Sequence, residues 1–244
     1  MGESGTRDEA GVDPADDVRR ALLLAVGHGL RTPIASAKAA AAGLHIDDKQ
    51  LPDADARELV SIIEDSLDRL NSMVDDVLTL GQIAAGCVAP AHDGVDLADA
   101  IDLAVATLRA GGLVRREFPA RPRPVAVADP IFTRRILEHL IRNALQHSPS
   151  DAPPTVVVSD NGGTATAVIA DHGPGLPASW SELTTPFPHR GDRQPRHGLG
   201  VGLAVSLALA EAMAGTLTPT DTPGGGLTVT LQLPGWPPTR RPPN

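Results

Sequence analysis

The feature of this sequence that most constrains its fold is an apolar stripe at helical spacing between residues 53 and 83. Apolar residues recur every three or four positions, and acidic and basic residues occupy the positions between them. The stripe comprises Leu59, Ile63, Leu67, Leu70, Val74 and Val77. A helix with such a stripe is stable only when other helices cover its apolar side.

The segment before this stripe shows the same period and supplies a first partner. A helix is predicted from residue 16 to residue 44, with a seam at Leu23, Val26, Leu30, Ala37, Ala40 and Leu44. The run HIDDKQLPDAD breaks it, and Asp53 or Asp55 is predicted to cap the next helix, which ends near Ile83. Two helices joined by a short loop form an antiparallel hairpin. A homodimer, which makes a four-helix bundle, would cover the remaining apolar surface.

From Val95 onward the pattern changes to alternating strands and helices. Helices are predicted at 97–109, 130–147 and 199–213, and strands at 125–129, 155–160, 164–171, 217–220 and 226–234. The helix at 130–147 is predicted to start at Pro130, a good first-turn residue. The strands at 155–160 and 164–171 are predicted to form a hairpin around Asn161-Gly162-Gly163. A long loop rich in Pro and Gly is predicted at 172–197. The mixture predicts an α/β sandwich, with helices on one face of a sheet, so the whole chain is predicted to be α+β.

The predicted division of the chain follows these changes in composition. It comprises a disordered tail at 1–15, the helical hairpin at 16–85, a linker at 86–94, the α/β domain at 95–235 and a proline-rich tail at 236–244.

Composition and charge exclude several classes of protein. The formal net charge is −9 without a basic block, which argues against a nucleic-acid partner. The single cysteine, Cys87, excludes an internal disulfide and a cysteine cluster for zinc. No apolar run approaches the roughly 20 residues of a membrane span, and the acidic N-terminus does not resemble a signal peptide. We therefore expect a cytoplasmic location and no direct membrane span.

Three motifs in the second half suit nucleotide chemistry, although each alone also fits a structural role. In DHGPG, Asp171 follows a strand, and Gly173 and Gly175 allow a flat ligand to approach. A carboxylate in this place can accept a hydrogen bond from an exocyclic amine such as that of adenine. Taken alone, D-x-G-x-G is also an ordinary turn.

The second motif is HGLGVGLAV, in which glycines lead into a helix. The glycines are Gly198, Gly200 and Gly202. Their amides and the helix N-terminus suit a phosphate chain. The spacing is neither that of a Walker loop nor that of a Rossmann fingerprint. Close packing of the helix on a sheet is the structural alternative.

The third motif is LEHLIRNALQHSP, predicted to be helical. His139 and Asn143 are four residues apart and share a face. The neutral amide oxygen of Asn143 suits a Mg²⁺ ion that nucleotide phosphates already hold. A satisfied core amide or cap is the alternative.

Together and in this order, the three motifs resemble the GHKL or Bergerat ATP-binding fold of histidine kinases, Hsp90-type chaperones, gyrases and MutL-type proteins. The resemblance implies that ATP is bound, that Asp171 contacts the adenine amino group and that Asn143 helps to hold Mg²⁺. It places the loop glycines beside the base and the helix-leading glycines beside the phosphates. The intervening loop would be an ATP lid, containing Phe187 in an aromatic box and Arg190, Arg193 and Arg196.

The stretch GHGLRTP, residues 27–33, resembles the H-[E/D]-L-R-T-P phosphoacceptor box of histidine kinases. The surrounding residues 22–44 resemble the kinase core of potassium-responsive KdpD-type sensors. On the predicted seam His28 faces solvent, as a phosphoacceptor must, and Pro33 is predicted to kink the helix. The resemblance implies ATP-dependent autophosphorylation of His28 and phosphoryl transfer to an aspartate on the receiver domain of a response regulator. Thr32 would position water for dephosphorylation of that regulator.

Three positions depart from the family pattern, namely Gly29, His139 and Gln146. Gly29 replaces the acidic residue that follows the phosphoacceptor, and general-base help is worth about 10²–10⁴-fold in rate. One alternative is therefore a degenerate kinase that acts as an ATP-binding dimeric regulatory module. Another is a different GHKL ATPase, such as a serine-kinase anti-sigma factor, which the L-R-T-P stretch argues against. Only a short tail precedes His28, so we expect an orphan kinase, a kinase that receives its signal from a partner, or a piece of a longer sensor.

Overall fold

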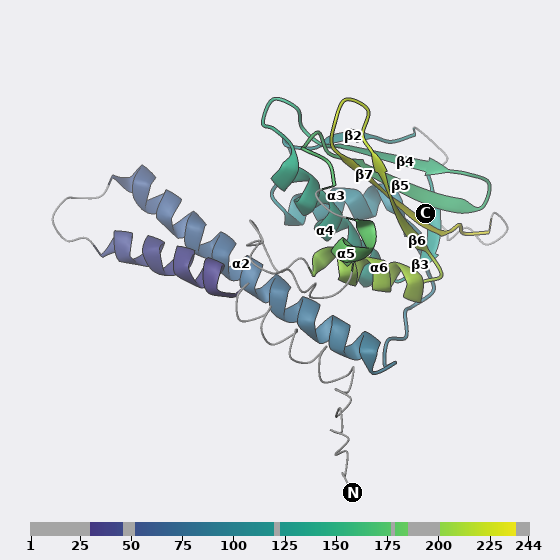
Figure 1. Cartoon of the computed structure of the whole chain (residues 1–244), viewed down its shortest axis with the longest axis horizontal. Helices are drawn as coiled ribbons and strands as arrows, with labels where there is room; N and C mark the ends of the chain where they lie inside the picture. The colour runs from purple at the N-terminus through teal and green to yellow at the C-terminus, as the bar shows by residue number, and fades with distance from the viewer. Residues whose placement is uncertain (1–29, 46–51, 120–122, 177–178, 185–200, 238–244) are drawn as a thin grey trace, which may run out of the picture. The chain divides into compact units, whose positions relative to one another are not determined.

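The computed structural model describes residues 30–45, 52–119, 123–176, 179–184 and 201–237 (Figure 1). Contacts divide these residues into two compact units, and the division falls between Met73 and Val74. The domain boundaries expected from composition remain a prediction.

The first unit is a helical hairpin. Residues 30–44 form one helix, and the part of α2 (Asp53–Ala84) up to Met73 forms the other. The two helices run side by side (Figure 1). A Cβ atom on Gly43 would lie 3.0 Å from Cδ1 of Leu59, so the missing side chain allows the helices to approach closely. The predicted antiparallel hairpin is confirmed. Asp53 and Asp55 lie inside the first turn of α2, where they complement the helix dipole, and not at the capping position predicted for one of them.

The apolar stripe on α2 is wider than the surface that its neighbours bury. Leu67 and Val74 were predicted to lie in a packed stripe, yet each is about half exposed, at 50% and 51%. Exposed apolar residues on α2 are Val60, Ile62, Leu67, Val74 and Leu78. A stripe at three- and four-residue spacing covers more than 100° of a helix, and one neighbouring helix covers only part of it.

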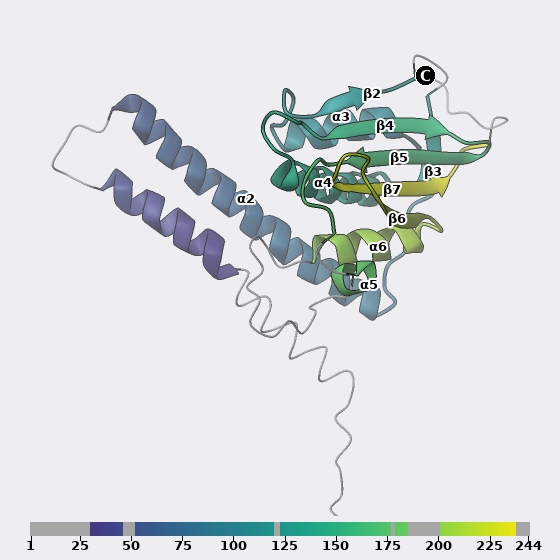
Figure 2. The same ribbon diagram turned by 45° about the horizontal axis from the view of Figure 1, so that its top comes forward.

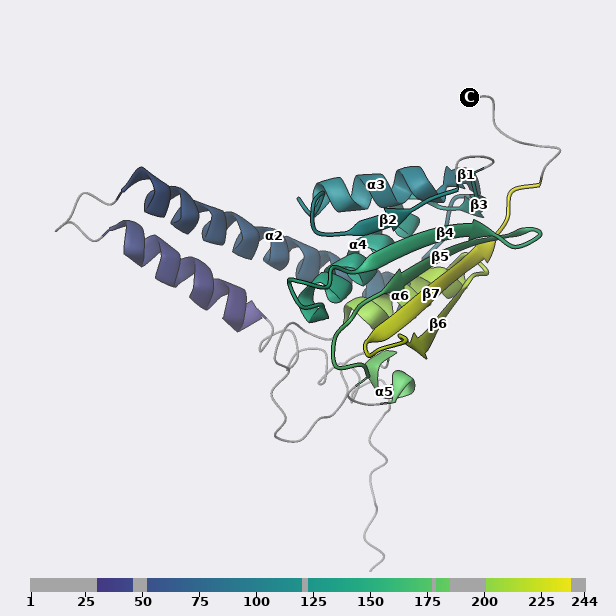
Figure 3. The same cartoon turned by 90° about the horizontal axis from the view of Figure 1, so that it is seen from above.

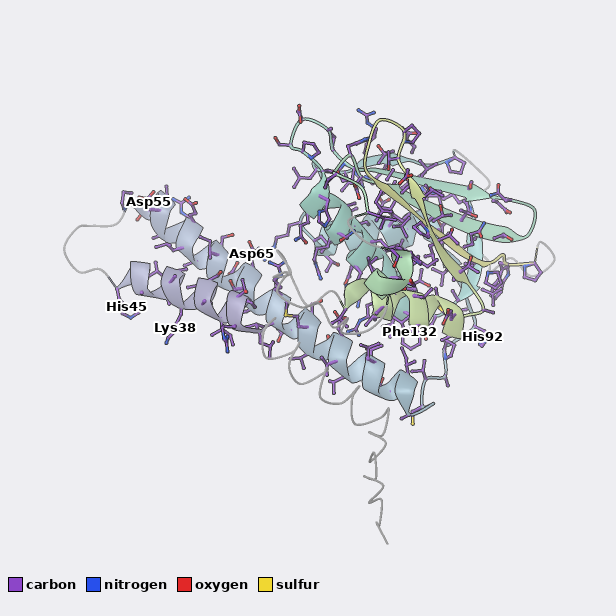
Figure 4. All side chains as sticks on the ribbon, in the orientation of Figure 1. Lys38, His45, Asp55, Asp65, His92 and Phe132 are labelled. Carbon is purple, nitrogen blue, oxygen red and sulfur yellow. The ribbon has the colours of Figure 1, made fainter. Side chains whose placement is uncertain are left out.

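Polar side chains of the hairpin point away from its apolar surfaces. Lys38 and His45 on helix 30–44, and Asp55 and Asp65 on α2, are all exposed (Figure 4). The buried hydroxyl of Ser66 is satisfied within the helix, because it donates to the carbonyl oxygen of Ile62 at 2.7 Å.

The second unit contains a five-stranded sheet of order β2-β4-β5-β7-β6. Its strands are β2 (Arg115–Glu117), β4 (Thr155–Asp160), β5 (Thr164–Ala170), β6 (Thr216–Asp221) and β7 (Leu227–Pro234). Only the β2–β4 pair is parallel. Strands β1 (Asp93–Asp96) and β3 (Val125–Ala128) form a separate antiparallel pair.

Three helices, α3 (Leu97–Thr107), α4 (Pro130–His147) and α6 (Gly202–Ala212), lie on one face of this sheet (Figures 2 and 3). The core between them is aliphatic. From the sheet it contains Ala165, Ala167 and Ile169 of β5 and Val229, Leu231 and Leu233 of β7. The predicted sandwich, with helices on one face, and the α+β class are confirmed.

The start of α4 determines where the candidate site residues lie. Oδ1 of Asp129 accepts hydrogen bonds from the amides of Ile131 and Phe132 at 2.9 and 3.0 Å, and Pro130 occupies the first turn. These residues satisfy amides that would otherwise lack partners and fix the helix start. The predicted bounds of α4 are confirmed.

Several elements differ from the predictions. Strand β1 begins inside the expected linker at 86–94. Strand β2 was not predicted, because its sequence RRE is polar, and all three residues are exposed. The predicted loop at 172–197 contains the short helix α5 (Trp180–Thr184). Helix α6 begins at Gly202 rather than at 199, since the described residue before it, Val201, is its cap. Across the described ranges, we find no helix with the length and apolar character that a membrane crossing requires.

Candidate nucleotide-binding site

Asp171 is held rigidly at the end of β5. It is 3% exposed, and its Oδ1 accepts hydrogen bonds from the amides of Gly173 at 2.9 Å and Leu227 at 3.0 Å. Within the described residues, both hydrogen bonds that this carboxylate accepts are accepted by Oδ1. Oδ2 therefore remains available to accept a hydrogen bond from a ligand. A fixed, buried acceptor suits an exocyclic amine such as that of adenine.

Gly226 makes this arrangement possible and was not singled out from the sequence. Its φ is +117°, and a Cβ atom there would overlap the carbonyl oxygen of Asp171 and lie 2.9 Å from Oδ1. Only glycine adopts this conformation at so close an approach. The run TPGGG reads as a turn in the sequence, and nothing local shows that it packs against residue 171.

The glycines of the DHGPG loop have different roles. A Cβ atom on Gly173 would lie 2.6 Å from the carbonyl oxygen of His147, so this glycine lets the loop pass close to the end of α4. Gly175 has a φ of +77°, which favours glycine whatever its surroundings. The first glycine is therefore needed for a close approach and the second for its backbone conformation.

Asn143 lies in the middle of α4 and is half-buried. In the part of the chain that the structure describes, its side chain makes no hydrogen bond. A half-buried amide without a protein partner keeps its oxygen available for a cation or a ligand.

His139 lies one turn before Asn143 and is buried, with 9% exposure. Its Nε2 is 2.9 Å from Oδ1 of Asp76 on α2. Its Nδ1 faces the start of α6, where a Cβ atom on Gly202 would lie only 2.9 Å away. The close packing of Gly202 thus involves the imidazole of His139.

The N-terminus of α6 presents backbone amides that no side chain of the described residues caps. The capping residue of the helix is Val201. The first-turn amides and the helix dipole therefore favour an anion such as a phosphate. Gly198 and Gly200, predicted to lie beside the phosphates, fall outside the described residues.

Helix α4 brings the three motifs together. The DHGPG loop packs against the carbonyl of His147, and the start of α6 packs against His139. These residues are eight apart, or about 12 Å along a helix, and Asn143 lies midway between them. The arrangement suits a ligand with a base at one end, phosphates at the other and a cation between.

Of the two predicted phosphotransfer residues, Thr32 lies in the first unit. His28 and Gly29 lie outside the described residues, as do Phe187, Arg190, Arg193 and Arg196 of the predicted lid. Thr32 is exposed on helix 30–44, and the buried Pro33 follows it. The predicted kink depends on the carbonyl of Gly29 and therefore also falls outside the described part of the chain.

Two family models match the chain. Residues 18–86 match the His Kinase A (phospho-acceptor) domain, and residues 128–237 match the histidine kinase-, DNA gyrase B-, and HSP90-like ATPase family.

Among curated proteins, the sensor protein KdpD of Mycobacterium tuberculosis is 37% identical over 231 residues, which cover 90% of this chain and 26% of that protein. KdpD of Rathayibacter rathayi is 36% identical over 225 residues, with the same coverage. The sensor histidine kinase MtrB of Mycolicibacterium paratuberculosis is 28% identical over 181 residues, covering 72% of this chain and 32% of that protein. The chain thus spans about a quarter to a third of the length of these relatives.

Solved structures share the fold at lower sequence identity. The histidine kinase AdeS of Acinetobacter baumannii superposes with a TM-score of 0.59 at 20% identity, covering 85% of this chain and 97% of AdeS. Full-length ShkA, solved in complex with AMPPNP, superposes with a TM-score of 0.58 at 20% identity, covering 91% of this chain and 45% of ShkA. With both family models matched in order and homology to the kinase regions of KdpD and MtrB sensors, the chain belongs to the histidine kinase family.

Proposed function

We propose that the chain binds ATP in the site along α4 and uses it to phosphorylate His28. The adenine amine would donate to Oδ2 of Asp171, and the phosphates would meet the uncapped amides at the start of α6. The observation that carries this proposal is the Asp171 carboxylate, which is buried, fixed by two amides and left with an acceptor atom. A fixed acceptor avoids reorganisation when the base binds.

The residues present also fit a Mg²⁺ ion. Asn143 offers an amide oxygen without a protein partner in the described residues, and oxygen ligands are those that Mg²⁺ prefers. When bound, Mg²⁺ would neutralise phosphate charge. The contribution of Asn143 would be to orient the triphosphate from the middle of α4.

In the proposed reaction, a neutral imidazole nitrogen of His28 attacks the γ-phosphorus in line. The N–P bond forms as the bond to the bridging oxygen breaks, and ADP leaves with the electron pair. The protein contributes mainly positioning and charge stabilisation. The phosphoryl group would then pass to an aspartate on the receiver domain of a response regulator. Thr32 would position the water that later hydrolyses this aspartyl phosphate and releases inorganic phosphate.

The proposed active form is a homodimer. The described part of α2 carries exposed apolar side chains at Val60, Leu67, Val74 and Leu78, spaced by seven, seven and four residues on one side of the helix. The same surface of a second copy would cover them in a four-helix bundle. We also propose that this part of the protein is cytoplasmic, where ATP is available.

Gly29 favours a second candidate function. It occupies the place of the acidic residue in the phosphoacceptor box, and glycine can neither accept a proton nor orient an imidazole. In this alternative the chain is a degenerate kinase, which binds ATP and dimerises as a regulatory module without efficient phosphotransfer.

The two candidates are separated by incubating the chain with γ-labelled ATP and Mg²⁺. We expect acid-labile label on the wild-type chain, and its loss in His28→Ala and Asn143→Ala. In Gly29→Glu we expect a gain in rate, up to about 10²–10⁴-fold if the new carboxylate acts as a general base. ATP binding without label in the wild type and in Gly29→Glu would favour the regulatory module, and acid-stable label would indicate a serine or threonine kinase.

A further inference from the structure

Asp76 is a buried carboxylate that the proposed chemistry does not use. It lies near the end of α2 and is 5% exposed. The contacts of this part of α2 place it in the same compact unit as the α/β domain. A buried ionised carboxylate is unfavourable unless charged or hydrogen-bonding partners compensate for its lost hydration.

Both partners of Asp76 lie on α4. Its Oδ1 is 3.0 Å from Nη2 of Arg135 and 2.9 Å from Nε2 of His139. These residues are four apart, so they present their side chains on the same face of α4. Arg135 supplies the compensating charge, while His139 supplies a second donor.

The contact with Asp76 determines the orientation of the His139 ring. An ionised carboxylate can only accept, so Nε2 carries the donated proton, and Nδ1 is turned toward Gly202. Nδ1 lies 2.9 Å, and Cγ 3.3 Å, from where a Cβ atom on Gly202 would be. The imidazole is therefore packed between Asp76 and the first residue of α6.

The start of α6 packs into the core through Val201, Ala204 and Val205, which are all buried. Among the described residues no side chain caps its first turn, and Ser206 donates to the carbonyl oxygen of Gly202 from within the same helix. The ring of His139 meets Gly202 itself, so this contact helps to set where the phosphate-facing amides of α6 lie.

We propose that Asp76 is a positioning residue for the nucleotide site, acting through His139 on the start of α6. The inference rests on the proposed ATP site and adds that a residue of α2, within the matched phosphoacceptor domain, controls nucleotide affinity. Asp76 itself touches no nucleotide in this scheme.

The first test measures ATP affinity by calorimetry on the full chain, at a temperature where circular dichroism shows each variant folded. Asp76→Ala is expected to weaken ATP binding at least fivefold. Asp76→Asn retains an oxygen that accepts from Nε2 and is expected to stay within twofold of wild type. Arg135→Gln, the matched control, removes the other partner without reaching Gly202 and is also expected to stay within twofold. Unchanged affinity in Asp76→Ala, or an equal loss in Arg135→Gln, would overturn the proposal.

The second test needs no nucleotide. Gly202→Ala is expected to lower the equilibrium constant for folding at least tenfold in the wild type, because the new methyl group meets the imidazole. In a His139→Ala background the same substitution should have no such effect, and this difference measures the coupling. Additive effects would refute the contact between His139 and Gly202, whether or not ATP binds. Strong coupling in a wild-type chain that does not bind ATP would refute the proposed nucleotide site instead, and with it the positioning role.

Discussion

Asp171→Asn should weaken ATP binding far more than it destabilises the fold, because it changes only the atom at the position of Oδ2. Oδ1 of Asp171 already accepts from the amides of Gly173 and Leu227. An asparagine can keep both bonds through its amide oxygen. Its NH₂ group must then replace Oδ2, which puts a donor opposite the donor of the adenine amine. The folded structure should lose about 1 kcal/mol or less, since a neutral hydrogen bond is weaker than a charge-assisted one by about that amount.

The effect on ATP binding should be much larger. A hydrogen bond to a charged group is worth about 1.5–3 kcal/mol, and the donor–donor contact adds to that loss. A total of about 2–4 kcal/mol corresponds to about a 30-fold to 1,000-fold rise in Kd. Screening by water does not reduce it much, because Asp171 is 3% exposed. GTP carries an acceptor oxygen where ATP carries the amine, so the preference for ATP over GTP should narrow in the same variant.

Titration calorimetry with ATP and GTP measures both effects, with thermal unfolding as the check on the fold. Asp160→Asn is the matched control, because this exposed carboxylate at the end of β4 loses the same charge. The reasoning is refuted if Asp171→Asn binds ATP as tightly as wild type, or if both variants lose affinity equally.

Further predictions concern the turn, the helical hairpin and the phosphatase reaction. Gly226→Ala should destabilise the fold by about 2–4 kcal/mol, because a non-glycine residue at positive φ costs about 1–3 kcal/mol and the new Cβ atom overlaps Asp171. Gly224 also has a positive φ but has open space around it, so Gly224→Ala should lower the melting temperature far less than Gly226→Ala. Leu67→Glu should weaken self-association at least tenfold by analytical ultracentrifugation. Leu113→Glu, on the other unit, should leave self-association unchanged, although Leu113 is 60% exposed and Leu67 is 50% exposed. Thr32→Ala should retain autophosphorylation and lose dephosphorylation of the cognate regulator; equal loss of both would contradict its assigned role.

Elements with strong local determinants were predictable from the sequence. The start of α4 was predicted because Pro130 fits the first turn of a helix, and the structure adds that Asp129 caps it. The β4–β5 hairpin was predicted because Gly162 and Gly163 provide the positive φ values of its turn. Strand β2 has no such determinant, since its three polar residues pair with β4 only through the backbone.

The candidate site shows the same contrast between local and tertiary information. Asp171 and its loop glycines form a short motif that the sequence displays directly. The hydrogen bond from the amide of Leu227 to Asp171 joins residues that are 56 positions apart, so no local sequence pattern predicts it. Asp76 looks like one of several surface charges on α2, and its burial arises only because α4 packs against it. Residues that support a site from distant segments are therefore the ones that sequence reasoning missed.

The central claim is that this chain transfers the γ-phosphoryl group of ATP to His28. The most direct measurement is mass spectrometric mapping of the modified residue, after incubation with ATP and Mg²⁺ and digestion without acid. The chain has 8 histidines, so mapping the phosphorylated residue distinguishes His28 from the other histidines as the acceptor. We predict phosphorylation on the peptide that contains His28 and none on that peptide in His28→Gln. Phosphorylation of another residue, or an unmodified chain that nevertheless binds ATP, would contradict the account.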